Sequence, residues 1–216
     1  LNEDAEYASW EAFLVGALRA EGLAVAAEEF AQAVEAAITR CDPNAHLAAL
    51  WRFVRPDVDR FYRLRTAFRD HQRALLSNPR VVRVRPEATR VIPELADRFV
   101  LALAANQPAV VLDLLRAEGL LGYFRWPYVS EGMGVAKPAL LFFRMILDGL
   151  SVAPEEAVMV GDRLDHDVLP AKLLGMRTVR VLVGPYADQI PISPLHCPDR
   201  TVTDLAALPA VLNQWV

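Results

Sequence analysis

The stretch that decides the fold spans residues 157–176 and reads AVMVGDRLDHDVLPAKLLGM. Its apolar, β-branched start ends at Gly161, and helical spacing of apolar residues resumes at Val168. The pattern predicts a strand, an acidic turn and a helix, and open α/β sheets bind ligands at this end of their strands. The acidic side chains of the turn are Asp162, Asp165 and Asp167.

Three carboxylates this close together repel one another unless a positive charge lies among them. A hard divalent cation such as Mg²⁺ supplies that charge and prefers oxygen ligands of this kind. An aspartate that follows a strand also commonly caps the next helix. The turn by itself therefore indicates either a metal site or a helix cap.

A lysine upstream adds a second charged group at a strand end. Lys137 lies in GMGVAKPALLFF, between a strand-like run at 126–130 and a helix whose first turn is set by Pro138. The chain has only one other lysine, Lys172. A compact ammonium suits a site that needs a point charge on a phosphate or carboxylate. The alternative is a surface lysine that precedes a helix.

The order Lys-Pro, helix, strand and GDxxxxD resembles the haloacid dehalogenase-like (HAD) hydrolase superfamily, from about Phe99 to the C-terminus. The resemblance implies an α/β fold: a Rossmannoid parallel sheet flanked by helices, with an all-helical cap. It implies that Lys137 is a catalytic, phosphate-binding residue that offsets the charge of a nucleophile. It also implies that Asp162 and Asp167 hold Mg²⁺, whereas Asp165 is the less expected ligand.

The chain departs from the family pattern at the second motif, where a Ser or Thr ends a strand. The strand here is FVLALAANQP, and the matching position is Ala105, which has no hydroxyl. We expect phosphate binding at Ala105 and Asn106 through the backbone N–H groups of Asn106 and Gln107, helped by the Asn106 amide. The alternative for Asn106 is an ordinary turn or helix-capping residue.

The family nucleophile, the first Asp of a DxDx(T/V) motif at the end of the first strand, has no match here. The chain opens LNEDAE at Leu1 instead of Met, and Asp4 is expected to cap a helix. We expect that the chain begins just after the nucleophile motif and is inactive as given. The sheet should then show a gap, a filling segment or direct pairing between the strands that end near Ala105 and Asp162.

The periodicity of apolar residues divides the chain into a helical cap at 1–85 and an α/β core at 86–216. The predicted cap helices are 4–20, 27–40, 44–54 and 57–76. The predicted core strands are 99–104, 126–130, 157–161, 178–183 and 200–203. The predicted core helices are 88–97, 108–118, 138–149, 166–175 and 204–213. Helix 57–76 carries five arginines, which favours a solvated helix, while a subset facing a cleft would favour an anionic substrate.

The composition excludes several classes of protein. The 216 residues are 54% apolar with mean hydropathy +0.20, enough for a sizeable core. No apolar stretch reaches the roughly 18 residues of a membrane span, and a net charge of −4 gives no general attraction to nucleic acid. Cys41 and Cys197 are isolated, which indicates no disulfide framework, a reducing compartment and a cytoplasmic protein. The oligomeric state stays open.

The resemblance favours a Mg²⁺-dependent phosphatase that acts on a small phosphorylated metabolite through an aspartyl-phosphate. Two alternatives stay open. A haloacid dehalogenase of the same superfamily needs no metal and leaves the aspartates less explained. A non-catalytic HAD-like binding module would bind the ligand without turning it over.

Overall fold

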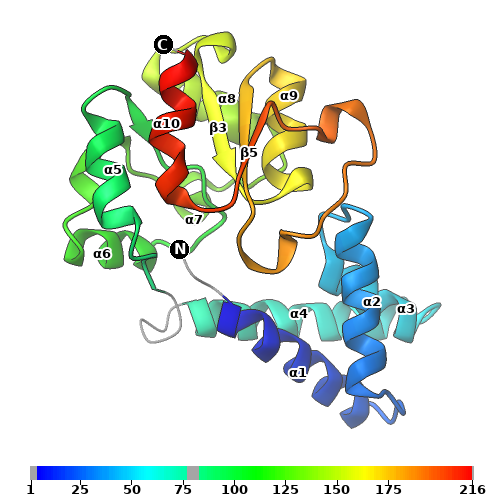
Figure 1. Ribbon diagram of the computed structural model, residues 1–216. Coiled ribbons are helices and arrows are strands. Elements are labelled where there is room, and N and C mark those ends of the chain that lie inside the picture. Colours follow the sequence, from blue (N-terminus) through cyan, green and yellow to red (C-terminus); the bar gives the residue numbers. More distant parts are fainter. Residues whose placement is uncertain (1–3, 77–82, 216) are drawn as a thin grey trace.

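The computed structural model describes residues 4–76 and 83–215, and it shows two parts (Figure 1). The opening residues Leu1–Glu3, which are expected to follow directly on the missing nucleophile motif, lie outside the described range. The first part, called here the helical part, holds four helices and lies below the rest in Figure 1. These are α1 (Asp4–Ala20), α2 (Ala27–Thr39), α3 (Ala45–Val54) and α4 (Val58–Leu76), which confirms the helices predicted for this region.

The helical part has an apolar core of its own. Leu14 and Leu18 of α1, Phe30 of α2 and Leu50 of α3 are fully buried against one another. Leu14 and Leu18 are four positions apart, a spacing that places both side chains on one face of α1. Tyr186, which comes from the other part of the chain, is buried in the same cluster and joins the two parts.

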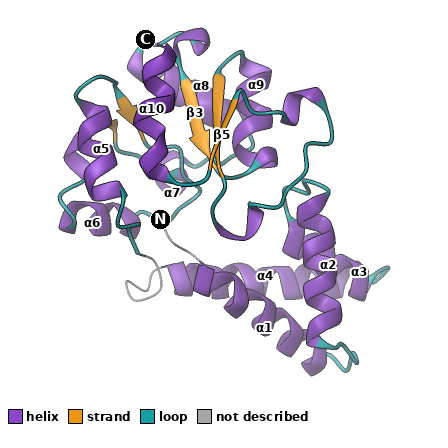
Figure 2. Cartoon of the chain, in the orientation of Figure 1, coloured by secondary structure: helices purple, strands orange, loops and turns teal. Residues whose placement is uncertain are grey.

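The second part, called here the α/β part, alternates strands and helices (Figure 2). Its strands are β1 (Leu101–Ala102), β2 (Phe124–Trp126), β3 (Val158–Gly161), β4 (Arg177–Val181) and β5 (Arg200–Val202). Its helices are α5 (Ala88–Ala96), α6 (Val110–Ala117), α7 (Ser130–Met133), α8 (Leu140–Leu150), α9 (Leu169–Leu174) and α10 (Leu208–Leu212). All strand pairs are parallel, as the alternation predicted.

The two faces of the sheet are covered by different helices. Val179 and Val181 of β4 pack against α5 and α10, whereas Met159 of β3 packs against α8 and α9. A parallel sheet needs this cover because its strands are apolar on both faces. The predicted α/β class, with a parallel sheet flanked by helices, is confirmed.

Within the described residues the strands form two separate sheets, β1–β2 and β3–β4–β5. Strands β1 and β3 do not pair, and no described strand lies between them. Of the three outcomes expected from the sequence, the structure therefore shows the gap. The edges of β1 and β3 that face it have no strand partner within the part of the chain that the structure describes.

The strand expected at 99–104 is confined to Leu101–Ala102, and two further elements differ from the sequence prediction. The strand expected at 126–130 ends at Trp126 because Pro127 has no N–H for the ladder, and α7 already begins at Ser130. The helix expected at 166–175 is preceded by a π-helical turn at Leu164–Val168, a geometry that apolar spacing does not predict.

No helix of the described residues is both long enough and apolar enough to cross a lipid bilayer. Cys41 is buried and Cys197 is exposed, and both are free thiols, so no disulfide framework exists between them.

Candidate active site

A cleft of about 640 Å³ opens between the helical part and the carboxyl ends of the strands. Its size suits a small molecule. The helical part contributes Trp10, His46, Arg65, Phe68, Arg69 and Gln72. The α/β part contributes Ala105, Asn106, Gln107, Lys137, Asp162 and Arg163, among others. The structure thus brings to one cleft the predicted site residues Ala105, Asn106, Lys137 and Asp162.

Lys137 and Asp167 form the central ion pair of the site. The Lys137 Nζ lies 2.5 Å from Asp167 Oδ1, and the two side chains are only 12% and 1% exposed. Removing one partner of a buried pair leaves an uncompensated charge, which is far costlier than losing a surface pair. The pair therefore fixes the direction in which the ammonium points into the cleft.

Asn106 holds the backbone of the lysine loop. Its Nδ2 donates to the Lys137 carbonyl at 2.9 Å, and the Lys137 N–H donates to Asn106 Oδ1 at 2.8 Å. These two bonds join the segment after β1 to the segment before α8. The side-chain amide is thereby occupied by the lysine backbone, and the part in phosphate binding predicted for Asn106 would fall to its N–H group.

Ala105 lies beside Asn106 on the cleft wall. Its carbonyl accepts a hydrogen bond from the Ser130 N–H at 3.1 Å, which ties the segment after β1 to the start of α7. The methyl side chain offers no donor to a ligand, as the sequence indicated.

The turn after β3 is built around a glycine that leaves room for a carboxylate. A Cβ on Gly161 would lie 2.2 Å from Asp167 Oδ2 and 2.3 Å from its Cγ, closer than atoms can approach. The Arg163 N–H also donates to Asp167 Oδ2 at 3.0 Å. The glycine, this N–H and the π-helical turn together turn the Asp167 side chain back toward Lys137.

The surroundings of Asp162 disfavour the charged form of its carboxylate. Burial, and next the charge of Asp167, raise its pKa to about 6, although Lys137 and Arg163 act in the opposite direction. A raised pKa means that the surroundings disfavour the charged form. A cation bound at Asp162 would relieve that cost.

Asp165 has a different environment and does not line the cleft. Burial opposes its charge, but hydrogen bonds from Arg163 and Gln189 outweigh that effect and keep the pKa of Asp165 below its ordinary value. Gln189 Nε2 donates at 2.8 Å, and its Oε1 accepts the Leu164 N–H at 2.8 Å. Asp165 is thus fully engaged in holding the turn.

Gln189 is itself positioned by a buried arginine, and nothing in the sequence pattern singled out either residue. Arg180 of β4 donates to the Gln189 carbonyl at 2.9 Å and to the Tyr186 carbonyl at 2.7 Å. An arginine within an apolar strand was the available signal, because a buried guanidinium needs several acceptors nearby.

The donor set fits Mg²⁺, although the described residues contain no group of three His, Cys, Asp or Glu side chains around one point. Mg²⁺ commonly keeps several waters and binds through one or two carboxylates plus substrate phosphate oxygens. Asp162, with its raised pKa, suits that mode. Asp167 is nearby, but its two oxygens already face Lys137 and the Arg163 N–H, so its part in metal binding stays a prediction.

Replacing Asp162 with Asn should stabilise the metal-free protein in a pH-dependent way. The folded pKa of about 6 lies above the ordinary 3.8, so the folded state binds more protons between these values and loses stability as pH rises through them. The stability difference between Asp162→Asn and wild type should grow over that range and stay flat above it, at about 1–3 kcal/mol. Urea unfolding at several pH values measures it, with Asp148→Asn on the exposed face of α8 as control. A pH-independent difference would contradict the assignment.

A profile of the family described as HAD-hydrolase-like matches residues 134–208, the segment that holds Lys137, Asp162 and Asp167. Two solved structures share the fold. One is a predicted phosphoglycolate phosphatase from Haemophilus somnus, with TM-score 0.67, 21% identity and coverage of 94% of this chain and 90% of that one. The other is the HAD hydrolase YfnB from Bacillus subtilis, with TM-score 0.61, 20% identity and coverage of 96% and 92%. The profile match is limited to residues 134–208, and the two structures show that this chain shares their fold.

Curated relatives are similar over shorter stretches. Phosphoserine phosphatase of Thermus thermophilus is 39% identical over 122 residues, which are 56% of this chain and 47% of that protein. Glyceraldehyde 3-phosphate phosphatase of Methanocaldococcus jannaschii is 47% identical over 70 residues, which are 32% and 31% of the two chains. The chain therefore spans less than half the length of these relatives.

Proposed function

We propose that this chain carries the phosphate and metal half of the active site of a Mg²⁺-dependent phosphatase that acts on small phosphorylated metabolites. The observation that carries the proposal is the buried Lys137–Asp167 pair, which lies beside the Asp162 carboxylate in one cleft at the strand ends. The names of the curated relatives, phosphoserine phosphatase and glyceraldehyde 3-phosphate phosphatase, support the reaction class.

In this proposal the basic residue of the cleft binds the phosphate and the acidic residues bind the metal ion. The Lys137 ammonium, oriented by Asp167 and by the Asn106 amide, would bind a phosphate oxygen and offset negative charge during attack. Asp162, with Asp167 next to it, would hold Mg²⁺, which when bound supplies the remaining positive charge. The N–H groups of Asn106 and Gln107 would contact the other phosphate oxygens.

The helical part would act as a cap. It forms the opposite wall of the cleft through residues of α1, α3 and α4, and Tyr186 of the α/β part is buried among its helices. A cap of this kind limits the access of water and supplies side chains that recognise the substrate. The boundary between the two parts is proposed to lie near residue 85.

A non-catalytic binding module is the second candidate, and the gap between β1 and β3 favours it. The proposed reaction passes through an aspartyl-phosphate, and its nucleophile would have to lie at the end of a strand in that gap. No described residue occupies that position. Such a module would bind the phosphorylated ligand and Mg²⁺ through the same residues without breaking the ester bond.

Two measurements on the purified chain test these alternatives. Calorimetric titration with Mg²⁺ should give binding that Asp162→Asn abolishes and that Asp113→Asn, an exposed change on α6, leaves intact. Hydrolysis of p-nitrophenyl phosphate is then followed with and without Mg²⁺. Mg²⁺-dependent turnover supports the phosphatase, and binding without turnover supports the module. Absence of any Asp162-dependent Mg²⁺ binding would overturn both candidates.

Replacing Ala105 with Ser should strengthen binding of the phosphate group. The new hydroxyl would add one donor at a cleft wall that now offers a methyl group, and a single donor to a charged acceptor is worth about 1.5–3 kcal/mol. We expect tighter orthophosphate binding in the presence of Mg²⁺, by roughly tenfold. Ala105→Val, which adds similar bulk without a hydroxyl, serves as control. Equal effects of the two changes would show that the backbone already satisfies the phosphate.

A further inference from the structure

One face of helix α4 looks into the cleft. Arg65, Arg69, Gln72 and Leu76 line it, and their spacing of four, three and four residues places them in a row along the helix. The other arginines of α4 are used elsewhere. Arg60 and Arg63 lie 3.4 and 3.1 Å from Glu21, which belongs to the segment after α1.

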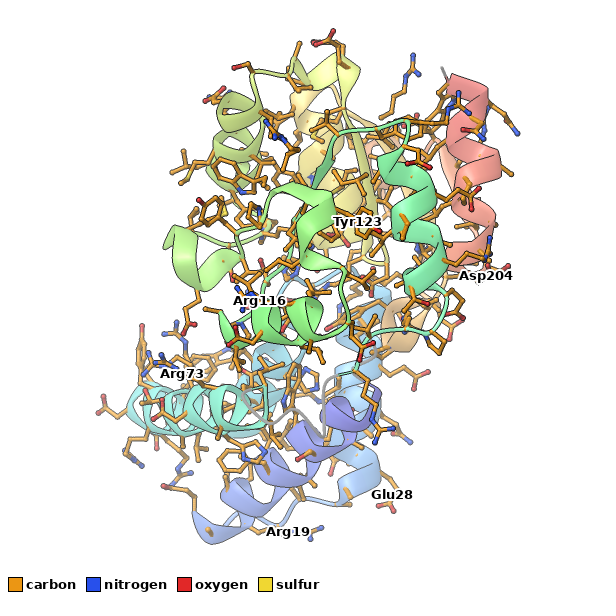
Figure 3. The ribbon with its side chains drawn as sticks, turned by 90° about the vertical axis from the view of Figure 1, so that its left-hand side faces the viewer. Arg19, Glu28, Arg73, Arg116, Tyr123 and Asp204 are labelled. Carbon is orange, nitrogen blue, oxygen red and sulfur yellow. The ribbon has the colours of Figure 1, made fainter. Side chains whose placement is uncertain are left out.

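Arg73, labelled in Figure 3, also has a different role from the two cleft arginines. It lies 3.0 Å from Glu131 of α7 and thus links the helical part to the α/β part. Of the five arginines noted in the sequence of this helix, only Arg65 and Arg69 line the cleft.

The charge of the cleft is opposite in sign to that of the chain. Among the residues that the structure describes, its lining includes several cations and one carboxylate, Asp162, whereas the whole chain carries a net charge of −4. The cations are Arg65, Arg69, Arg85, Lys137 and Arg163. A cleft with this imbalance attracts anions and concentrates them.

Two cations of the cleft, Lys137 and Arg163, already have buried acidic partners. Lys137 pairs with Asp167, and Arg163 pairs with Asp165. Across the cleft, Arg69 is 3.5 Å from Asp70, but both side chains are largely exposed, so this pair is weak. The Arg65 guanidinium lies 5.9 Å from the centre of the Tyr62 ring, a contact that leaves its charge in place. Unlike Lys137 and Arg163, the α4 cations Arg65 and Arg69 thus face the cleft without a buried acidic partner among the described residues.

We propose that the ligand of this cleft is a phosphate ester with a second anionic group, a carboxylate or another phosphate, and that Arg65 and Arg69 bind that second group. The proposal rests on the proposed function, in which the first phosphate binds at Lys137. Arginine presents a planar set of N–H donors that matches the oxygens of a carboxylate or phosphate. Two arginines one helical turn apart can therefore bind the same anion. Arg65 and Arg69 are thus specificity-determining residues.

Matched ligand pairs test the second group alone. 3-Phosphoglycerate and glycerol 3-phosphate differ by a carboxylate in place of a hydroxymethyl group, and fructose 1,6-bisphosphate differs from fructose 6-phosphate by one phosphate. Titration calorimetry in Mg²⁺ at low salt should show at least one pair in which the doubly anionic member binds about tenfold tighter or more. Which pair shows the larger ratio distinguishes a carboxylate from a second phosphate.

Variants of α4 then identify the residues responsible. Arg65→Gln with Arg69→Gln should reduce the ratio within each pair to near one while the singly anionic member keeps its affinity. Arg65→Lys with Arg69→Lys should retain part of the ratio because the charges remain. Arg63→Gln, on another face of the same helix, should leave the ratio unchanged. Urea unfolding of each variant checks that it is folded.

The outcomes separate this proposal from the proposed function. If the wild-type chain binds both members of every pair equally, or if the double Gln variant preserves the ratio, the assignment of Arg65 and Arg69 is overturned and the phosphate site stands. If the wild-type chain binds none of the four compounds, the phosphate site itself is overturned and the assignment falls with it.

Discussion

Replacing Asp167 with Ala should lower the free energy of unfolding by about 3–5 kcal/mol. The change would leave the Lys137 ammonium, which is only 12% exposed, without its partner at 2.5 Å. It would also deprive the Arg163 N–H of its acceptor at 3.0 Å. Both groups are costly to leave without a partner away from water. Urea unfolding followed by circular dichroism measures the change.

A surface pair of the same type provides the control. Asp113 and Arg116 pair on α6, and both side chains are more than half exposed. Asp113→Ala should therefore change the free energy of unfolding by less than about 0.5 kcal/mol. A loss in Asp167→Ala no larger than in this control would show that the pair does not carry the stability assigned to it.

Replacing Gly161 with Ala should disable the site and also destabilise the fold, because it displaces the carboxylate of the buried Lys137–Asp167 pair. The added methyl group would lie 2.2 Å from Asp167 Oδ2, so the carboxylate must leave its position beside Lys137. Forcing one carbon into a filled site costs about 1–3 kcal/mol by itself, and separating the buried Lys137–Asp167 pair adds to that cost. Losing a well-oriented charged group weakens a phosphate site by about 10–100-fold. Orthophosphate binding in Mg²⁺ and urea unfolding measure the two effects.

Gly16 offers a control of opposite sign. It lies inside α1, where an added Cβ meets nothing within 4 Å, and Ala is the better helix former. Gly16→Ala should raise the free energy of unfolding by about 0.5–1 kcal/mol and leave phosphate binding unchanged. If Gly161→Ala bound phosphate as wild type does, the tight contact around Asp167 would not be required for the site.

The sequence predicted the order of elements because each has a clear period or boundary. The helices of α1 to α4 follow from their apolar spacing and from breaks at Gly22 and Pro56. The segments that carry Lys137, before α8, and Asp162, after β3, followed from the Lys-Pro and GD motifs. That the structure brings these residues into one cleft agrees with the rule that ligands bind at the carboxyl ends of parallel strands.

The contacts that complete the site could not be predicted, because they join residues far apart in the chain. Asn106 and Lys137 are 31 positions apart, and Asp165 and Gln189 are 24 apart. The periodicity of a sequence does not predict which residue the side-chain amide of an asparagine or a glutamine will bond. The direction of Arg65 and Arg69 likewise depends on how α4 packs on the α/β part, which no local pattern encodes.

Gln189 gives the molecule a mechanical link between its two parts. The same side-chain amide donates to the Ile38 carbonyl of α2 at 3.4 Å and to Asp165 at 2.8 Å, while its oxygen accepts the Leu164 N–H. A rotation of the helices away from the strands would pull directly on the acidic loop. Movement of the helices that admits a ligand would then also shift the acidic turn, because Gln189 is bonded to both.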